Sequence, residues 1–181
     1  RAVFAEVDEA LDQSLSKVMW EGPEDQLTLT ENAQPALMAV SLAALRTLEA
    51  EKGFSLNDRV SFVAGHSLGE YSALAAAGAL SLADTARLLK TRGRAMQAAV
   101  PVGQGAMAAL LGAELPQAQE LAKAASEGEV CAAANDNAPG QVVISGDEAG
   151  VAEGMTRARE AGAKRALPLN VSGAFHSPLM E

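Results

Sequence analysis

The sequence predicts an α/β protein in which a small unit of order β-α-β-β-α-β is inserted into a larger part. Two observations lead to this class. First, a short apolar strand at residues 60–64 runs directly into a Gly-x-Ser-x-Gly motif at residues 65–69 and then into a helical segment. Second, the rhythm changes beyond Gly103, where short strand and helix patterns alternate.

Helical patterns dominate the chain before the motif. One helix is expected to end near Trp20, before a polar turn at residues 22–25, and a second to run over residues 34–52. The second helix carries an apolar face at near-helical spacing, formed by Leu37, Val40, Ala44, Leu45 and Leu48.

Two further helices are expected after the strand. The first continues from the motif through Ala79. The second begins at residues 81–84, which have the form of a capping box, and ends before Pro101.

The second half of the chain predicts a small domain. Its elements are strand 106–111, helix 116–126, strand 129–134, strand 141–145, helix 148–161 and strand 164–169. This is the order of a ferredoxin-like unit. We therefore predict a small domain at residues 103–170, inserted into a large domain made of residues 1–102 and 171–181.

Composition excludes several classes of function. The net charge of −9 argues against a nucleic-acid partner. No apolar run approaches the roughly 20 residues of a membrane span, and no secretion signal is recognisable, so a cytoplasmic location is expected. Cys131 is the only cysteine, which excludes an internal disulfide and disfavours a metal site. Its apolar neighbours predict a buried, unreactive thiol.

Ser67 is the candidate nucleophile. In a sharp turn from strand to helix, the serine hydroxyl is pushed out toward substrate. Gly65 and Gly69 are expected to supply the room that so tight a turn needs. The backbone N–H of Leu68, at the start of the following helix, is placed to stabilise an oxyanion. A glycine-flanked turn with an incidental serine is the structural alternative.

A serine nucleophile needs a base, and the chain contains two histidines. His66 is adjacent to Ser67, so its side chain should diverge, and we interpret it as structural. His176 lies beyond the predicted small domain, which would place the pair at a domain junction, where ligand sites concentrate. A histidine in a surface loop is the alternative reading of His176.

Several segments resemble one family. The motif Gly-His-Ser-Leu-Gly-Glu-Tyr at residues 65–71 is similar to that of the malonyl-CoA:acyl carrier protein transacylases and the related acyltransferase domains of fatty acid and polyketide synthases. The similarity extends, in the family's order, to residues 34–37, 92–97, 105–107, 137–146 and 173–176. Practically the whole chain is covered, whereas the serine motif alone also fits esterases and lipases.

This resemblance implies an α/β-hydrolase-like large domain and a ferredoxin-like small one. It implies Ser67 as nucleophile, His176 as general base and the Leu68 N–H in the oxyanion hole. It implies malonyl-CoA as substrate, the phosphopantetheine of an acyl carrier protein as acceptor, and neither a metal nor a redox cofactor. The family also has an N-terminal glutamine turn and a C-terminal segment that this chain lacks, so the chain is expected to be truncated at both ends. Gln104 does not correspond to the family's oxyanion-hole glutamine.

Two residues are implied as substrate contacts. Arg92 matches the arginine that pairs with the malonyl carboxylate, and helical geometry places it on the apolar face with Leu88, Leu89 and Met96. An arginine on an apolar face requires an anion, which could also be a protein carboxylate in a structural ion pair. Phe175 resembles the residue that marks malonyl-selective members.

The predicted function is therefore malonyl transfer in fatty acid biosynthesis. An acyltransferase domain of a polyketide synthase is one alternative. Another is a serine hydrolase that uses Asp136 or Asp147, both expected in loops of the small domain, and a third is a non-catalytic module that docks carrier protein. An acidic carrier protein would need a local basic patch, for which we consider Arg87, Lys90 and Arg94, or Lys164 and Arg165.

Overall fold

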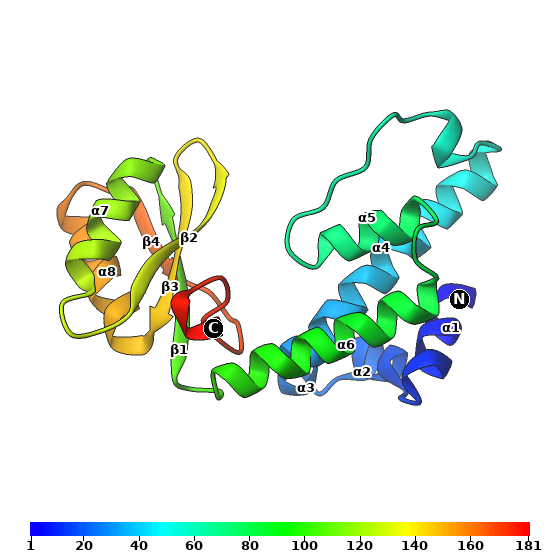
Figure 1. Cartoon of the computed structure of the whole chain (residues 1–181), viewed down its shortest axis with the longest axis horizontal. Coiled ribbons are helices and arrows are strands. Elements are labelled where there is room, and N and C mark those ends of the chain that lie inside the picture. Colours follow the sequence, from blue (N-terminus) through cyan, green and yellow to red (C-terminus); the bar gives the residue numbers. More distant parts are fainter. The chain divides into compact units, whose positions relative to one another are not determined.

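The computed structural model describes all residues, 1–181, and divides into two units, Arg1–Arg94 and Ala95–Glu181. The boundary falls inside helix α6 (Leu82–Ala99), and Figure 1 labels the elements of each unit. None of the helices is both long enough and apolar enough to span a bilayer. The predicted division into 1–102 with 171–181, and 103–170, stays a prediction.

The first unit is helical. Before α6 it contains α1 (Ala2–Leu11), α2 (Leu15–Glu21), α3 (Glu24–Thr28), α4 (Thr30–Lys52), η1 (Leu56–Asp58) and α5 (Gly69–Ala76). The single helix expected before Trp20 is two helices, because the chain turns at Asp12, whose φ is 47°. The carboxylate of Asp8 accepts hydrogen bonds from the N–H and hydroxyl of Ser16, which fixes the start of α2.

The long helix α4 buries a different face from the one predicted. Its buried apolar residues are Ala36, Met38, Ala39 and Leu42, which pack with residues of α1, α2 and α6. Of the predicted face, Leu37, Val40 and Leu48 are about half exposed, at 55%, 47% and 50%. Both sides of this helix carry apolar residues, so apolar spacing alone did not identify the side that packs.

The predicted strand at residues 60–64 does not form. Residues 59–68 are a loop between η1 and α5, as Figure 1 shows, and Phe62 is 92% exposed. A cavity of about 360 Å³ lies between Val63, Ala64 and helices α4 and α5. A strand requires a hydrogen-bonded neighbour. The first unit contains no strand with which residues 60–64 could pair, so this apolar segment stays a loop.

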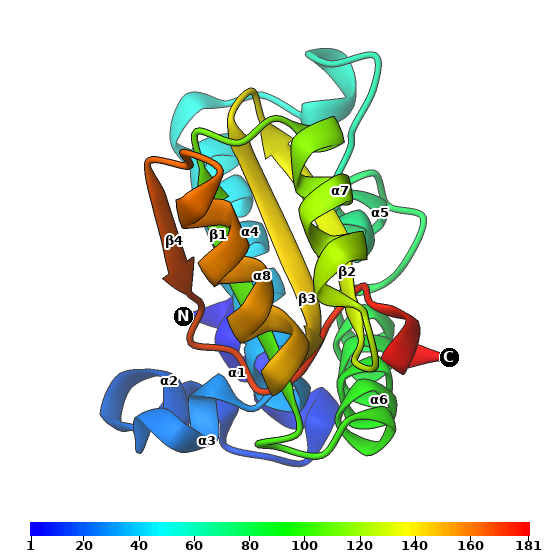
Figure 2. The same cartoon turned by 90° about the vertical axis from the view of Figure 1, so that its left-hand side faces the viewer.

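The second unit has the predicted β-α-β-β-α-β order. Its elements are β1 (Gly105–Leu111), α7 (Leu115–Ala125), β2 (Cys131–Ala138), β3 (Gln141–Asp147), α8 (Glu148–Glu160) and β4 (Arg165–Pro168), followed by η2 (Pro178–Met180). The strands form one sheet in the order β2-β3-β1-β4, and every neighbouring pair is antiparallel. Helices α7 and α8 lie side by side over one face of this sheet, as Figure 2 shows.

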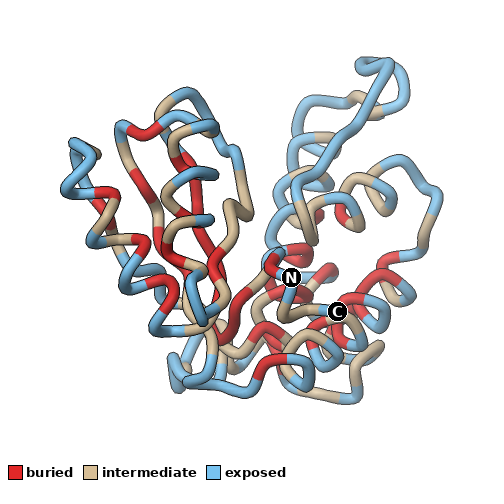
Figure 3. The backbone as a smooth tube through the Cα atoms, turned by 60° about the vertical axis from the view of Figure 1, so that its left-hand side comes forward, coloured by how far each residue is buried: buried red, intermediate tan, exposed pale blue.

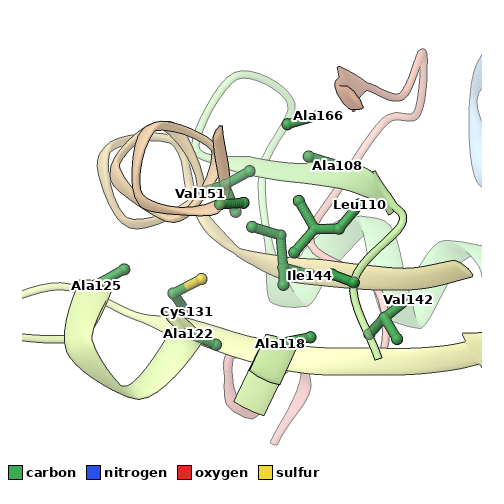
Figure 4. Close-up of a cluster of buried hydrophobic side chains, with 12 residues drawn as sticks. Ala108, Leu110, Ala118, Ala122, Ala125, Cys131, Val142, Ile144, Val151 and Ala166 are labelled. Carbon is green, nitrogen blue, oxygen red and sulfur yellow. The ribbon is translucent and has the colours of Figure 1, made fainter. Parts of the chain in front are cut away.

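Small aliphatic side chains fill the core between this sheet and its helices. Leu110 and Ile144 project from adjacent strands toward Val151 of α8, as Figure 4 shows, and all three are at most 2% exposed. Gly154 of α8 allows close packing, because a Cβ there would lie 2.7 Å from Ile144 Cδ1. The buried positions coloured red in Figure 3 follow these strands and the inner sides of the helices.

Cys131 belongs to this core, as predicted. Its side chain is 7% exposed and packs at the start of β2. Burial raises the pKa of the thiol to about 11, and the negative charge of Asp147 adds to the effect. A thiol in this state is a poor nucleophile.

Candidate active site

The serine motif forms a tight turn at the start of α5. Ser67 has a left-handed backbone, with φ of 54°, which is uncommon for a residue with a side chain. The turn is closed by hydrogen bonds from the N–H of Gly69 to the carbonyl of His66, at 2.8 Å, and from the N–H of Glu70 to that of Ser67, at 3.2 Å. Strain of this kind concentrates at functional sites.

The two glycines of the motif differ in what surrounds them. A Cβ at Gly65 would lie 1.9 Å from the carbonyl carbon and oxygen of Gly69, a distance at which the turn could not close. A Cβ at Gly69 would meet nothing within 4 Å. The expectation that a side chain would collide at either glycine is therefore confirmed for Gly65 and wrong for Gly69.

Helix α6 begins as its sequence predicts. The N–H of Asp84 donates to Ser81 Oγ at 3.0 Å, and that hydroxyl donates to the Asp84 carboxylate at 2.7 Å. Farther along, Gly93 lets α6 approach the start of α4 very closely. A Cβ on Gly93 would lie 2.4 Å from the Cα of Glu31 and 2.7 Å from the carbonyl oxygen of Thr30. This close approach brings Arg92, the preceding residue, to the side chains of α4.

The guanidinium of Arg92 contacts the candidate nucleophile. Its Nη2 lies 3.1 Å from Ser67 Oγ, and its Nη1 donates a short hydrogen bond to Oε1 of Gln34. The guanidinium carbon also lies 5.9 Å from the centre of the Tyr71 ring. Both hydrogen-bond acceptors are neutral, so the alternative of a structural ion pair with a protein carboxylate is wrong. A cation held in this way is suited to bind an anionic group beside Ser67.

The other basic residues of α6 already pair with protein carboxylates. Lys90 is only 9% exposed and lies 3.2 Å from Glu31 Oε2, while its ammonium also donates to Asn32 at 2.8 Å. Arg94 contacts the same carboxylate at 3.1 Å, and Arg87 contacts Asp84 at 3.1 Å. The predicted basic patch at Arg87, Lys90 and Arg94 is therefore wrong for Lys90, which is buried.

This arrangement also affects Glu31. Partial burial acts to raise the pKa of its carboxyl, but hydrogen bonds and positive charge from Arg94 and Lys90 outweigh burial and lower the pKa below its ordinary value. Glu31 is therefore held as a carboxylate, and it satisfies the charge of the buried Lys90.

His176 lies in the second unit, in a turn between β4 and η2. Its backbone is also left-handed, with φ of 58°, and its side chain is exposed. The hydroxyl of the next residue, Ser177, donates to the carbonyl of Ala174 at 2.7 Å. Ala174 is fully buried against Gly105, where a Cβ would lie 2.7 Å from the methyl of Ala174. The turn that carries His176 is thus anchored on the start of β1.

Phe175 also lies in this turn. Its ring packs over Gly173, where a Cβ would come within 3.0 Å of the ring.

The predicted site residues are divided between the two units. The first unit brings Ser67, Leu68 and Arg92 together, and the second holds Phe175 and His176, which are adjacent in the sequence. The pairing of Ser67 with His176 stays a prediction. The structure contains no group of three or more His, Cys, Asp or Glu side chains that could hold a metal ion.

The family model of the acyl transferase domain matches residues 1–181. This chain belongs to the acyl transferase family. Among curated relatives, it is 49% identical to a malonyl CoA-acyl carrier protein transacylase of Bacillus subtilis, over 100% of this chain and 56% of the relative. It is 43% identical to the transacylase of Escherichia coli K12, over 98% of this chain and 56% of that protein.

Solved structures of the acyl transferase family agree with the fold. An acyl-carrier-protein S-malonyltransferase from Bartonella henselae has a TM-score of 0.92 at 56% identity, over 99% of this chain and 57% of that one. A malonyl-transacylase in complex with a type II PKS acyl-carrier protein has a TM-score of 0.90 at 42% identity, with the same coverage. The chain is therefore a mixed α/β protein of this family, and it spans just over half the length of these relatives.

Sequence reasoning gave no role to two residues that contact Arg92. Gln34 and Tyr71 both fall in segments that resemble the family, but neither was assigned a contact. The spacing of Thr30 and Gln34, four residues apart on one helix, signals only their contact with each other. The contacts of Gln34 and Tyr71 with Arg92 depend on packing between helices, for which the sequence has no local signal.

Proposed function

We propose that the protein transfers a malonyl group from malonyl-CoA to the phosphopantetheine thiol of an acyl carrier protein, through a malonyl ester of Ser67, in fatty acid biosynthesis. The observation that carries this proposal is the contact of 3.1 Å between Arg92 Nη2 and Ser67 Oγ. It places a cation that hydrogen-bonds only neutral acceptors beside a serine in a strained turn, as attack on an acyl group with a terminal carboxylate requires. The names of the relatives support the same activity.

In the first half-reaction, His176 accepts the proton of Ser67 as Oγ attacks the thioester carbonyl carbon. The N–H of Leu68 stabilises the resulting oxyanion, and Arg92 holds the malonyl carboxylate. The carbon–sulfur bond then breaks, and coenzyme A leaves as a thiol with the proton from His176. A malonyl-serine ester remains.

In the second half-reaction, the carrier thiol gives its proton to His176 and attacks the ester carbonyl. The new carbon–sulfur bond forms, the bond to Ser67 Oγ breaks, and the serine recovers the proton. Phe175 would crowd a branched α-carbon and so favour malonyl over methylmalonyl groups. No metal or redox cofactor takes part in this scheme.

The finer architecture belongs to the same proposal. Residues 1–102 and 171–181 would form an α/β-hydrolase-like large domain, with a ferredoxin-like small domain at residues 103–170. The sheet order β2-β3-β1-β4 supports the second part of this description. In this proposal Ser67 and His176 act together in catalysis, in a cytoplasmic enzyme.

A serine hydrolase fits the geometry less well. The carboxylate of Asp147 is engaged at the start of α8, where it accepts from the N–H groups of Gly150 and Val130, both at 2.6 Å. Asp136 lies within β2, and Asp147 is the last residue of β3, so the prediction that both lie in loops is wrong. Neither residue supports a role as the third member of a triad with His176.

The carrier protein requires a basic surface on this acidic chain. Of the two predicted patches, the one on α6 is reduced by the burial of Lys90. Lys164 and Arg165, at the start of β4, are both exposed. We therefore propose Lys164 and Arg165 as the residues that meet the carrier protein.

The partition of products tests this function. The full-length protein would be given labelled malonyl-CoA and carrier protein bearing phosphopantetheine, and malonyl carrier protein and free malonate would be quantified. Transfer predicts that malonyl carrier protein is the main product. A hydrolase would release mainly free malonate, and a docking module would bind carrier protein without acylating it.

The proposed contact with carrier protein is tested separately. Reversing the charge of Lys164 and Arg165 should raise the KM for carrier protein and leave the KM for malonyl-CoA unchanged.

A further inference from the structure

Gln34 occupies an unusual place beside the candidate site. It lies on α4, is 3% exposed, and its amide oxygen accepts the hydrogen bond from Arg92 Nη1. Its Nε2 donates to Thr30 Oγ1 at 2.8 Å, one helical turn earlier. A guanidinium only donates, so the oxygen of the amide has to face Arg92, and the bond to Thr30 holds the amide nitrogen in place.

This contact controls where the guanidinium points. Arginine has a long, flexible side chain whose ordering is costly in conformational entropy. Here one edge of the planar group is bound by Gln34 and its carbon lies over Tyr71, and the Nη2 edge is the one that reaches Ser67. The orientation is therefore prepared before any substrate arrives.

The chemistry of the acceptor matters as well. A carboxylate in place of the amide would orient Arg92 equally well but would neutralise it, and it would compete with the carboxylate of the substrate. An amide oxygen orients the cation and leaves its charge available for an incoming anion.

We propose that Gln34, itself oriented by Thr30, is a positioning residue for Arg92 and sets the preference of the site for acyl groups that end in a carboxylate. The inference rests on the proposed malonyl transfer, because it assigns the residue that makes the Arg92 contact selective.

Three substitutions separate orientation from charge. Gln34→Met keeps the volume and removes the acceptor, Gln34→Glu keeps the acceptor and adds a charge, and Thr30→Val removes the group that orients the amide. Gln117→Met is the matched control, because Gln117 lies on α7 in the second unit and donates to the carbonyl of Ala161. Rates of Ser67 acylation are measured in the full-length protein with malonyl-CoA and with acetyl-CoA, which has no terminal carboxylate.

Gln34→Met should lower kcat/KM for malonyl-CoA about 10- to 100-fold, mainly through KM, and leave acylation by acetyl-CoA within about twofold. Gln34→Glu should lower the malonyl rate at least as much. Thr30→Val should give a smaller loss in the same direction, which Thr30→Ser restores. Equal losses with both thioesters, or no loss with malonyl-CoA, would overturn the proposal.

A binding measurement keeps this inference separate from the proposed function. In Ser67→Ala protein, which cannot be acylated at this position, Gln34→Met should weaken binding of malonyl-CoA and leave binding of acetyl-CoA unchanged. If the parent protein forms no malonyl ester, the proposed function fails, while the binding comparison still decides the role of Gln34. Equal affinities of the Gln34 variant and its parent for malonyl-CoA would contradict the positioning role.

Discussion

Arg92 keeps a cation available beside Ser67, because none of its hydrogen bonds goes to a carboxylate. Its place on a mostly apolar helix face led to the expectation of an anionic partner, and its hydrogen bonds go to the neutral groups of Gln34 and Ser67. Lys90, two residues earlier, was expected at the surface and is buried. Helical periodicity gives the direction in which both side chains leave the helix. The partner of Lys90, however, is Glu31 of α4, and a contact between two helices depends on packing and not on periodicity.

The glycines of the serine turn give a sharp prediction at the same scale. Gly65→Ala places a methyl group against the backbone of Gly69, so the turn has to open and move Ser67. We expect acylation to fall about 100-fold or more, because displacements of about 1 Å have effects of this size. Gly69→Ala is the matched control, since its methyl would meet open space, and it should stay within about threefold of the parent. Comparable losses in both variants, in single-turnover acylation with malonyl-CoA, would contradict this account of the turn.

At the scale of elements, the sequence predicted the second unit well and the first unit less well. Strands β1 and β3 and helices α7 and α8 lie within a few residues of their expected positions, because each pairs with neighbours inside the same short segment. The segment 60–64 has the composition of a strand, but strand formation depends on a partner that local sequence does not reveal. The face of α4 that packs was missed for a similar reason, since both faces are apolar.

The contact between α4 and α6 predicts a dependence of stability on pH. Because the pKa of Glu31 is lower in the folded protein than its ordinary value of 4.5, its contribution to stability is present above about pH 4.5 and is lost as the pH falls through the folded value. Glu31→Gln should therefore destabilise the protein by about 1–3 kcal/mol at pH 7. The difference from the parent should shrink toward pH 3.

Urea unfolding of both proteins between pH 7 and pH 3 measures this difference. Arg94→Gln serves as the control, because the side chain of Arg94 is 67% exposed, and exposed ion pairs contribute at most about 1 kcal/mol. A Glu31→Gln effect that stays constant or grows as the pH falls would rule out the proposed role of the carboxylate.

The core of the second unit predicts the reactivity of Cys131. With a pKa of about 11, roughly one thiol in a thousand is ionised at pH 8, and the thiolate is the reactive form. The native protein should react with a disulfide reagent at least about 100-fold more slowly than the same protein unfolded in urea. Similar rates in the native and unfolded states would show that β2 does not shield the thiol.

At the scale of the whole molecule, family membership came from motifs spread along the chain, and the match over residues 1–181 agrees with it. The sequence assigns the nucleophile turn and the histidine turn to one large domain interrupted by the small one, and that division stays a prediction; in the structure each turn lies within its own unit. Both turns use a left-handed residue, at Ser67 and at His176, held by close approaches of Gly65 and Gly105. The glycines of the Gly-x-Ser-x-Gly motif indicate the turn at Ser67 from the sequence. The turn at His176 has no comparable local motif.

In the proposed reaction, Ser67 carries the malonyl group, and His176 activates the serine hydroxyl. Mass spectrometry of the full-length protein after brief exposure to malonyl-CoA, followed by peptide mapping, tests both roles. We expect one malonyl group per chain on Ser67, absent in Ser67→Ala and formed far more slowly in His176→Ala. A malonyl group on any other residue, or an ester that forms at the parent rate without His176, would contradict it.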